Sequence, residues 1–169
     1  MTEKTSTSDR KATYQDLMAA AKDRELTPEE IDLGNGFFES AADQPIPLGL
    51  EALMGVRYQS VGPKKVSLIM TADPRHLQPA GLVNGGVFAV LGETAGSIAG
   101  FIAAGTDRPV VGANNSTDFF RPGKAGDTII STAEPVHIGR TSQVWEIRHE
   151  NGEGKLLART NLRLAVLPK

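Results

Sequence analysis

One acidic side chain stands alone in the most apolar stretch of this 169-residue chain: Glu93 is the only charged residue between Asn84 and Thr106. Ser97 follows four residues later, so in a helix its hydroxyl shares a face with the Glu93 carboxylate. A carboxylate in apolar surroundings is a typical general base or nucleophile, and a neighbouring hydroxyl can position a substrate or a water molecule. We interpret these two residues as a candidate catalytic pair. The alternatives are a structural glutamate held by a core hydrogen bond, or a membrane-spanning helix with a stray acid.

This apolar stretch has the start, the end and the composition of a buried five-turn helix. Asn84 is a good N-cap, because its side-chain oxygen can accept from first-turn amides, and Gly105 is a typical C-terminal stop. Each glycine inside the helix costs about 1 kcal/mol relative to alanine. Three of these glycines recur at every fourth position, Gly92, Gly96 and Gly100. The stripe predicts close packing against another layer, with the carboxylate enclosed.

The first part of the chain predicts a helical extension. Residues 1–10 are polar and are expected to be unstructured, and residues 13–22 can form a short helix. Thr27-Pro-Glu-Glu30 is a stronger signal, because Thr as N-cap, Pro at the first helical position and Glu at the third form a capping box. The helix that starts there is expected to run to Ala42 and to end before Pro45.

The later segments alternate apolar and polar residues with the two-residue period of strands, and turn residues separate them. Two such segments precede the long helix and four follow it. With no second long apolar helix, this order predicts an α+β fold in which one antiparallel sheet wraps around a central helix. The expected strands are Val56–Val61, Lys65–Ala72, Val110–Phe120, Thr128–Ile138, Ser142–Glu150 and Leu156–Leu167.

Composition narrows the classes of function. A net charge of −2 without a run of Lys or Arg argues against nucleic acid as a partner. The chain has no cysteine, so disulfides, thiolate catalysis and zinc–thiolate sites are excluded, and the spacing of its three histidines predicts no metal site. Because the N-terminus carries no secretory signal, we expect a cytoplasmic protein that does not enter a membrane.

The segment Asp73–Ser97 contains a loop glutamine, an Asn-Gly-Gly helix start and an acid eight residues after the first glycine. In this it resembles the hotdog-fold acyl-CoA thioesterases of the PaaI-like and 4-hydroxybenzoyl-CoA thioesterase type. The resemblance covers about residues 48–167, and it implies a hotdog domain over residues 48–169 after a tail and helical extension over residues 1–47. Further marks similar to those of the family are Phe119-Phe-Arg-Pro122, Gly126-Asp127 and Gly139-Arg140.

The resemblance implies a role for each residue of a catalytic site. Gly85 matches the position whose amide polarises the thioester carbonyl, and Glu93 matches the catalytic carboxylate. Gln78 matches the loop amide of the family, and Ser97 falls where some members carry a hydroxyl that assists water. Asn84 departs from the pattern, because the family usually has histidine there.

Coenzyme A enters this interpretation as part of the substrate, and no other cofactor is expected. Arg121, Arg140 and Thr141 lie at predicted loop ends, where the phosphates of coenzyme A could be bound. A solvated surface charge is the alternative for each arginine. The polar run Asn114–Asp118 either lines the site or sits at a subunit contact, and the sequence does not choose between these two.

The distance along the helix predicts how the site is assembled. Gly85 and Glu93 are separated by on the order of 12 Å at 1.5 Å per residue, so they cannot meet the same carbonyl within one chain. Two helices that run antiparallel across a twofold axis would bring them together. We therefore expect a homodimer or homotetramer with shared sites that hydrolyses an acyl-CoA to an acid and coenzyme A. The alternatives are an acyl-CoA-binding hotdog protein without turnover and, with less support, a hotdog hydratase or dehydratase.

Overall fold

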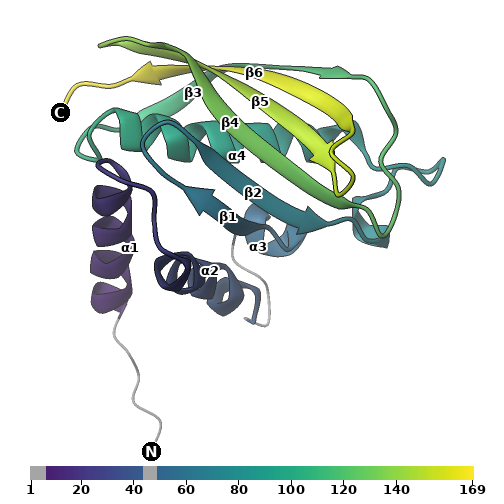
Figure 1. Ribbon diagram of the computed structural model, residues 1–169, viewed down its shortest axis with the longest axis horizontal. Helices are drawn as coiled ribbons and strands as arrows, with labels where there is room; N and C mark the ends of the chain where they lie inside the picture. Colours follow the sequence, from purple (N-terminus) through teal and green to yellow (C-terminus); the bar gives the residue numbers. More distant parts are fainter. Residues whose placement is uncertain (1–6, 44–48) are drawn as a thin grey trace, which may run out of the picture.

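Six strands form one antiparallel sheet in the order β1-β2-β4-β5-β6-β3, and this sheet curves around the long helix α4 (Figure 1). The computed structural model describes residues 7–43 and 49–169. The strands are β1 (Arg57–Val61), β2 (Val66–Thr71), β3 (Val110–Phe119), β4 (Thr128–Ile138), β5 (Ser142–Asn151) and β6 (Leu156–Val166). The helices are α1 (Thr7–Ala21), α2 (Pro28–Ala42), α3 (Leu50–Met54) and α4 (Gly85–Ala103), with a 3-10 turn η1 (Pro74–His76). The predicted arrangement of one antiparallel sheet around one central helix is confirmed.

The predicted element boundaries hold with one exception, which lies at the N-terminus. Each strand begins and ends within one residue of its expected bounds. The helix α1, however, begins at Thr7, so the expectation that residues 7–10 are unstructured is wrong, and residues 1–6 lie outside the described part. These residues form the first turns of a helix whose later part packs Leu17 and Met18 into the core.

Close packing explains why α4 carries so many glycines. Asn84 caps the helix by accepting from the amide of Gly86 at 2.8 Å, and Gly105 ends it with a φ of +93°. A Cβ at Gly92 would lie 2.7 Å from Oγ1 of Thr160, so only glycine lets the helix approach β6 this closely. The glycines of the stripe face successive side chains of β6: Gly92 faces Thr160, Gly96 faces Leu162 and Gly100 faces Leu164.

The opposite face of α4 is covered only in part. Glu93, Thr94, Ser97 and Ile98 are half-buried rather than enclosed, which corrects the expectation of a helix buried on all sides. By length and composition α4 could cross a membrane, but half of its apolar window is buried inside this fold, as in the core helix of a globular domain. The sheet thus leaves one side of α4 open to other elements.

The N-terminal helices lie on the side of the molecule away from β5 and β6 (Figure 1). The predicted capping box at Thr27 and Glu30 starts α2 as expected. From α2, Asn35 accepts from the backbone amide of Tyr58 at 2.6 Å and donates to the carbonyl of the same residue at 3.1 Å. Asn35 therefore takes the place of a neighbouring strand at the outer edge of β1. The aromatic rings of Phe38 and Tyr58 pack with their centroids 4.9 Å apart.

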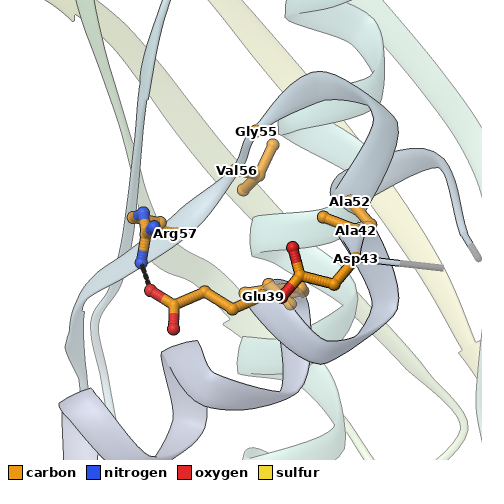
Figure 2. A pocket seen from close by; sticks show the side chains of 8 residues that line it. Glu39, Ala42, Asp43, Ala52, Gly55, Val56 and Arg57 are labelled. Atoms are coloured by element: carbon orange, nitrogen blue, oxygen red, sulfur yellow. Dashed lines mark hydrogen bonds and ion pairs between the residues drawn. The ribbon is translucent and has the colours of Figure 1, made fainter. Parts of the chain in front are cut away.

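A shallow cavity of about 330 Å³ marks the seam between α2 and the α3–β1 connection (Figure 2). An ion pair between Arg57 and Glu39 crosses this seam (Figure 2). Both side chains are at least half exposed, so the pair contributes little to stability. None of the residues predicted for catalysis lines this cavity. Its lining comes from α2, α3 and the start of β1, so it marks where the N-terminal extension docks on the sheet.

Candidate active site

Glu93 is held by β3 at two points. Its Oε2 accepts from Nδ2 of Asn115 at 3.1 Å, and the same nitrogen donates to the carbonyl of Ala89, one turn earlier in α4, at 3.0 Å. On the other side, a Cβ at Gly112 would overlap the Glu93 carboxylate. Within the described residues no cation forms an ion pair with Glu93. The carboxylate is therefore oriented by an amide without being neutralised by a positive charge.

A cavity of about 350 Å³ lies against this carboxylate, and we call it the Glu93 cavity. One wall comes from α4 and includes Glu93 and Ser97, so the structure places the two residues of the predicted pair side by side. The other walls come from the N-terminal part of the chain, which the sequence had not linked to the site. The complete lining is Tyr14, Phe38, Glu51, Tyr58, Glu93, Thr94, Ser97 and Ile98.

The far wall of the Glu93 cavity combines aromatic rings with hydrogen-bonding groups. Tyr14 and Tyr58 both line this wall. Burial raises the pKa of both phenols above the usual value, so both are neutral at physiological pH. Nearby, Oγ1 of Thr94 donates to Oε1 of Glu51 at 3.0 Å. The second carboxylate oxygen of Glu51 is free of any bond among the described residues, so this wall still offers an acceptor.

A second cavity of about 460 Å³ lies at the start of α4, and we call it the Gly85 cavity. It brings together three predicted site residues, Gln78, Gly85 and Arg121. A Cβ at Gly85 would lie 2.8 Å from Cζ of Phe119, so glycine is required where this ring covers the helix start. Asn84 precedes Gly85 and its oxygen is used by the helix cap. One chain thus divides the predicted site into two cavities, one with Glu93 and Ser97 and one with Gln78 and Gly85.

The residues predicted to contact coenzyme A are separated in the same way. Arg121 lines the Gly85 cavity and donates to the carbonyl of Leu156 at 2.8 Å. Arg140 and Thr141 are exposed in the turn between β4 and β5, and neither lines the cavities described above. Because β4 runs from the region of Arg121 to that of Arg140, the two arginines lie at opposite ends of the sheet.

His76, in the loop that precedes α4, lines neither cavity. The ring is buried, and its Nδ1 accepts from the amide of Asp73 at 2.9 Å. It therefore belongs to the loop that precedes α4. Among the described residues, no group of three or more His, Asp or Glu side chains is arranged to hold a metal ion.

Asn115 and Gly112 contact the Glu93 carboxylate, and the sequence did not single out either residue. The sequence shows only that the run Asn114–Asp118 is polar, which is consistent with a place in the site or at a subunit contact. Within this run, Asn115 hydrogen-bonds the Glu93 carboxylate, and Thr117 hydrogen-bonds Asn115. The only signal in the sequence was the unusual polarity of a strand that crosses the core helix.

Comparisons with known proteins identify the family of the chain. Residues 80–158 match the model of the thioesterase superfamily. The chain is 34% identical over 114 residues to the proofreading thioesterase EntH of Cronobacter turicensis, covering 68% of this chain and 82% of that protein. It is 31% identical over 114 residues to the 1,4-dihydroxy-2-naphthoyl-CoA hydrolase of Escherichia coli, covering 68% of this chain and 83% of that protein.

A solved structure extends the similarity beyond the segment that matches the family model. The crystal structure of a thioesterase from Haemophilus influenzae matches with a TM-score of 0.71 and 28% sequence identity, over 81% of this chain and 90% of that one. The fold, the family model and the similar sequences all lead to one class. The chain belongs to the thioesterase superfamily, with its hotdog fold, and is a thioester hydrolase.

Proposed function

We propose that this protein hydrolyses an acyl-CoA to a carboxylic acid and free coenzyme A, with Glu93 as general base or nucleophile. The observation that carries the proposal is the Glu93 carboxylate itself, which Asn115 orients at the wall of a cavity of ligand size. Either role is chemically consistent. Glu93 takes a proton from the attacking water, or its oxygen attacks the carbonyl carbon and water then cleaves the resulting anhydride. In both cases the sulfur of coenzyme A leaves as a thiol.

The start of α4 is suited to stabilise the negative charge that develops on the thioester oxygen during the reaction. The amide of Gly86 is taken by the side chain of Asn84, whereas no acceptor within the described residues uses the amide of Gly85. A carbonyl placed there meets a free N–H at the positive end of a helix dipole, which favours the negative charge that develops on its oxygen. Gln78, on the same cavity, is suited to hold the thioester from the side.

We propose that a complete site needs two chains. Glu93 lies eight residues after Gly85 in one helix, which is about 12 Å along the axis, and the two residues line different cavities. The strand β3 pairs with β6 on one side, and most of its side chains are exposed. An open edge of ten residues is a template for pairing with another strand. A twofold contact at β3 would place Glu93 of one chain near Gly85 of the other, in a homodimer or in the dimers of a tetramer.

The lining of the Glu93 cavity supports an aromatic acyl group that carries a hydroxyl. Phe38, Tyr14 and Tyr58 offer flat apolar surfaces, and Glu51 offers an acceptor at the far wall. The similar protein of Escherichia coli is named for a dihydroxynaphthoyl-CoA, a substrate of this class. Ser97 stands beside Glu93, where its hydroxyl can position the attacking water.

Coenzyme A would lie toward the Gly85 cavity, where Arg121 is available for its phosphates. Arg140 and Thr141 lie at the opposite end of β4, so they join the same site only through a second chain. We propose the cytoplasm as the site of action, since the chain has no cysteine that would require an oxidising compartment.

A panel of acyl-CoA thioesters, assayed by thiol release, tests the proposal directly. We expect turnover of at least one aromatic thioester by the native protein, and a loss of about 10³-fold in kcat for Glu93→Gln. Glu134→Gln is the matched control, because Glu134 is an exposed carboxylate on β4 that lines neither cavity. Retention of kcat within a few-fold by Glu93→Gln would remove Glu93 from the reaction, and an inert native protein would remove the acyl-CoA assignment.

A further inference from the structure

A line of hydrogen-bonded side chains runs from Ser131 through the buried His149 and ends at Glu93. His149 lies on β5, and its Nδ1 is 2.8 Å from Oγ of Ser131 on β4. Its Nε2 is 2.9 Å from Oγ1 of Thr160 on β6. All three side chains are fully buried. Both ring nitrogens of His149 are therefore occupied within the core.

The line continues from β6 to the edge strand β3 and from there to the helix. Oγ1 of Thr160 is 2.7 Å from Oγ1 of Thr117, its partner across the two strands. Oγ1 of Thr117 donates to Oδ1 of Asn115 at 3.3 Å, and Nδ2 of Asn115 donates to Glu93 at 3.1 Å. We call these five residues the polar line: Ser131, His149, Thr160, Thr117 and Asn115.

The orientation of the Asn115 amide is determined by its neighbours. Its nitrogen faces two acceptors, the carbonyl of Ala89 and the carboxylate of Glu93, so this end must be the NH₂ group. Its oxygen faces the hydroxyl of Thr117, which must then donate its single proton to Asn115. A flipped amide would place an oxygen against a carboxylate.

The remaining proton positions follow one after another. Because Thr117 donates to Asn115, it accepts from Thr160, and Thr160 in turn accepts from Nε2–H of His149. Nδ1 of His149 then carries no proton and accepts from Ser131. Burial lowers the pKa of His149 to about 3, which keeps the ring neutral, as this pattern of one donor and one acceptor requires. Every donor along the polar line thus points toward Glu93.

The fold makes specific room for this arrangement. Oγ1 of Thr160 occupies the place that a Cβ at Gly92 would need, so the helix glycine admits the hydroxyl. Buried polar groups stabilise a core less than apolar ones of the same size unless every group is paired, and here the chain of bonds pairs each one. A valine at position 160 would fill the same space without needing hydrogen-bond partners.

We infer that the polar line positions the catalytic carboxylate: Ser131, His149, Thr160 and Thr117 hold the Asn115 amide in the one orientation that donates to Glu93. These four are positioning residues, since none of them lines the Glu93 cavity. The inference rests on the role proposed for Glu93. It assigns to buried side chains of β4, β5 and β6 a function in setting the geometry of the reaction.

Two substitutions at one position separate positioning from packing. Thr160→Val removes the hydroxyl but keeps the shape, and we expect kcat to fall about 10-fold or more with KM within about twofold. Thr160→Ser keeps the hydroxyl and is expected to restore most of kcat. Thr132→Val is the matched control. It removes a hydroxyl in the same sheet that is bonded to Ser67 at 2.9 Å and is not part of the polar line. We expect its kcat to be unchanged.

A double-mutant cycle tests whether Thr160 acts through Asn115. In an Asn115→Leu background, Thr160→Val is expected to cause no further loss of kcat, since the amide it holds is gone. Additive losses, or a folded Thr160→Val protein with native kcat, would overturn the inference. If Thr160→Val fails to fold, Thr117→Val breaks the same line at a half-buried position and carries the same expectations.

A measurement independent of turnover uses the ¹H–¹⁵N spectrum of the His149 ring. The polar line requires the Nε2–H tautomer in the native protein at neutral pH, and an Nδ1–H tautomer would contradict it. This spectrum also distinguishes the two proposals. An inactive native protein with the Nε2–H tautomer would remove the proposed function but leave the hydrogen-bonded line in place.

Discussion

Gly112 of β3 lies directly against the carboxylate of Glu93, so close that a Cβ at position 112 would overlap Oε1. The edge strand therefore touches the carboxylate twice, with the bare backbone of Gly112 on one oxygen and the amide of Asn115 on the other. Any side chain at 112 must displace Glu93 or separate β3 from α4.

Gly112→Ala is expected to lower kcat/KM by about 10²-fold, because a shift of about 1 Å at the reacting group is enough for such a loss. Steady-state thiol release on the best acyl-CoA substrate measures it. Gly36→Ala is the control, since a Cβ at Gly36 meets nothing within 4 Å. Unchanged activity in folded Gly112→Ala would show that the contact does not constrain the carboxylate.

Asn84→Ala is expected to lower the free energy of unfolding by about 1 kcal/mol, since it deletes the N-cap of α4. Urea denaturation followed by circular dichroism gives this value. Asn84→His should retain kcat within a few-fold if the residue serves only to cap and position. A native protein that is inert on every thioester tried, beside an active Asn84→His variant, would show that Asn84 does not suffice for the reaction.

Glu51→Gln is expected to reduce the preference for hydroxylated over unsubstituted aromatic acyl-CoA by about tenfold in kcat/KM, the size expected for losing a hydrogen bond to a charged acceptor. Glu39→Gln serves as the control, because Glu39 pairs with Arg57 outside the Glu93 cavity. Equal preferences in the native protein and in Glu51→Gln would exclude Glu51 from substrate recognition.

Mixing two inactive variants tests the shared site. Glu93→Gln lacks the carboxylate and Gly85→Pro lacks the amide, so a heterodimer contains one intact site composed of the native halves. We expect activity to return after subunit exchange, up to about a quarter of the native level for random pairing into dimers. If exchange is confirmed by mass spectrometry and activity does not return, each site is complete within one chain.

The buried His149 predicts how stability depends on pH. Its folded pKa is depressed to about 3, below the value of 6.5 for the free side chain, so only the unfolded chain gains a proton between these values. The contribution of neutral His149 to the free energy of unfolding is therefore fully present above pH 6.5. It is lost as pH falls toward 3, at up to about 1.4 kcal/mol per pH unit. Between pH 7 and 5 the native free energy of unfolding should decline more steeply than that of His149→Leu. Parallel declines would show that His149 titrates alike in both states.

The long helix and the strands were predictable because their signals are local. Asn84 marks the start of α4 by its side-chain cap, and Gly105 marks its end by its positive φ. The glycine stripe predicts that another layer packs closely against the helix, without identifying that layer. Glu93 and Ser97 share a face by helix periodicity alone. Each of these inferences needs only neighbours in sequence.

The partners of Glu93 were not predictable, because they depend on how distant elements meet. The register of β3 against β6 shifts between Gly112 and Asn114, and such a bulge changes which side chains face the helix. Alternation along the strand therefore could not assign Asn115 to the carboxylate. Tyr14 lines the Glu93 cavity although it lies in α1, more than seventy residues before Glu93. No local sequence pattern predicts that α1 packs at this place.

The bond from Asn35 to both backbone groups of Tyr58 has a consequence for growth of the sheet. It closes the outer edge of β1, while the edge of β3 stays open. Joining two chains at β3 uses up the open edge of each and leaves only closed edges outside. Edge-to-edge addition would then end at two copies, because the outer edge of β1 is occupied by Asn35 and by the amide of Leu26, which donates to the carbonyl of Val61 at 2.8 Å.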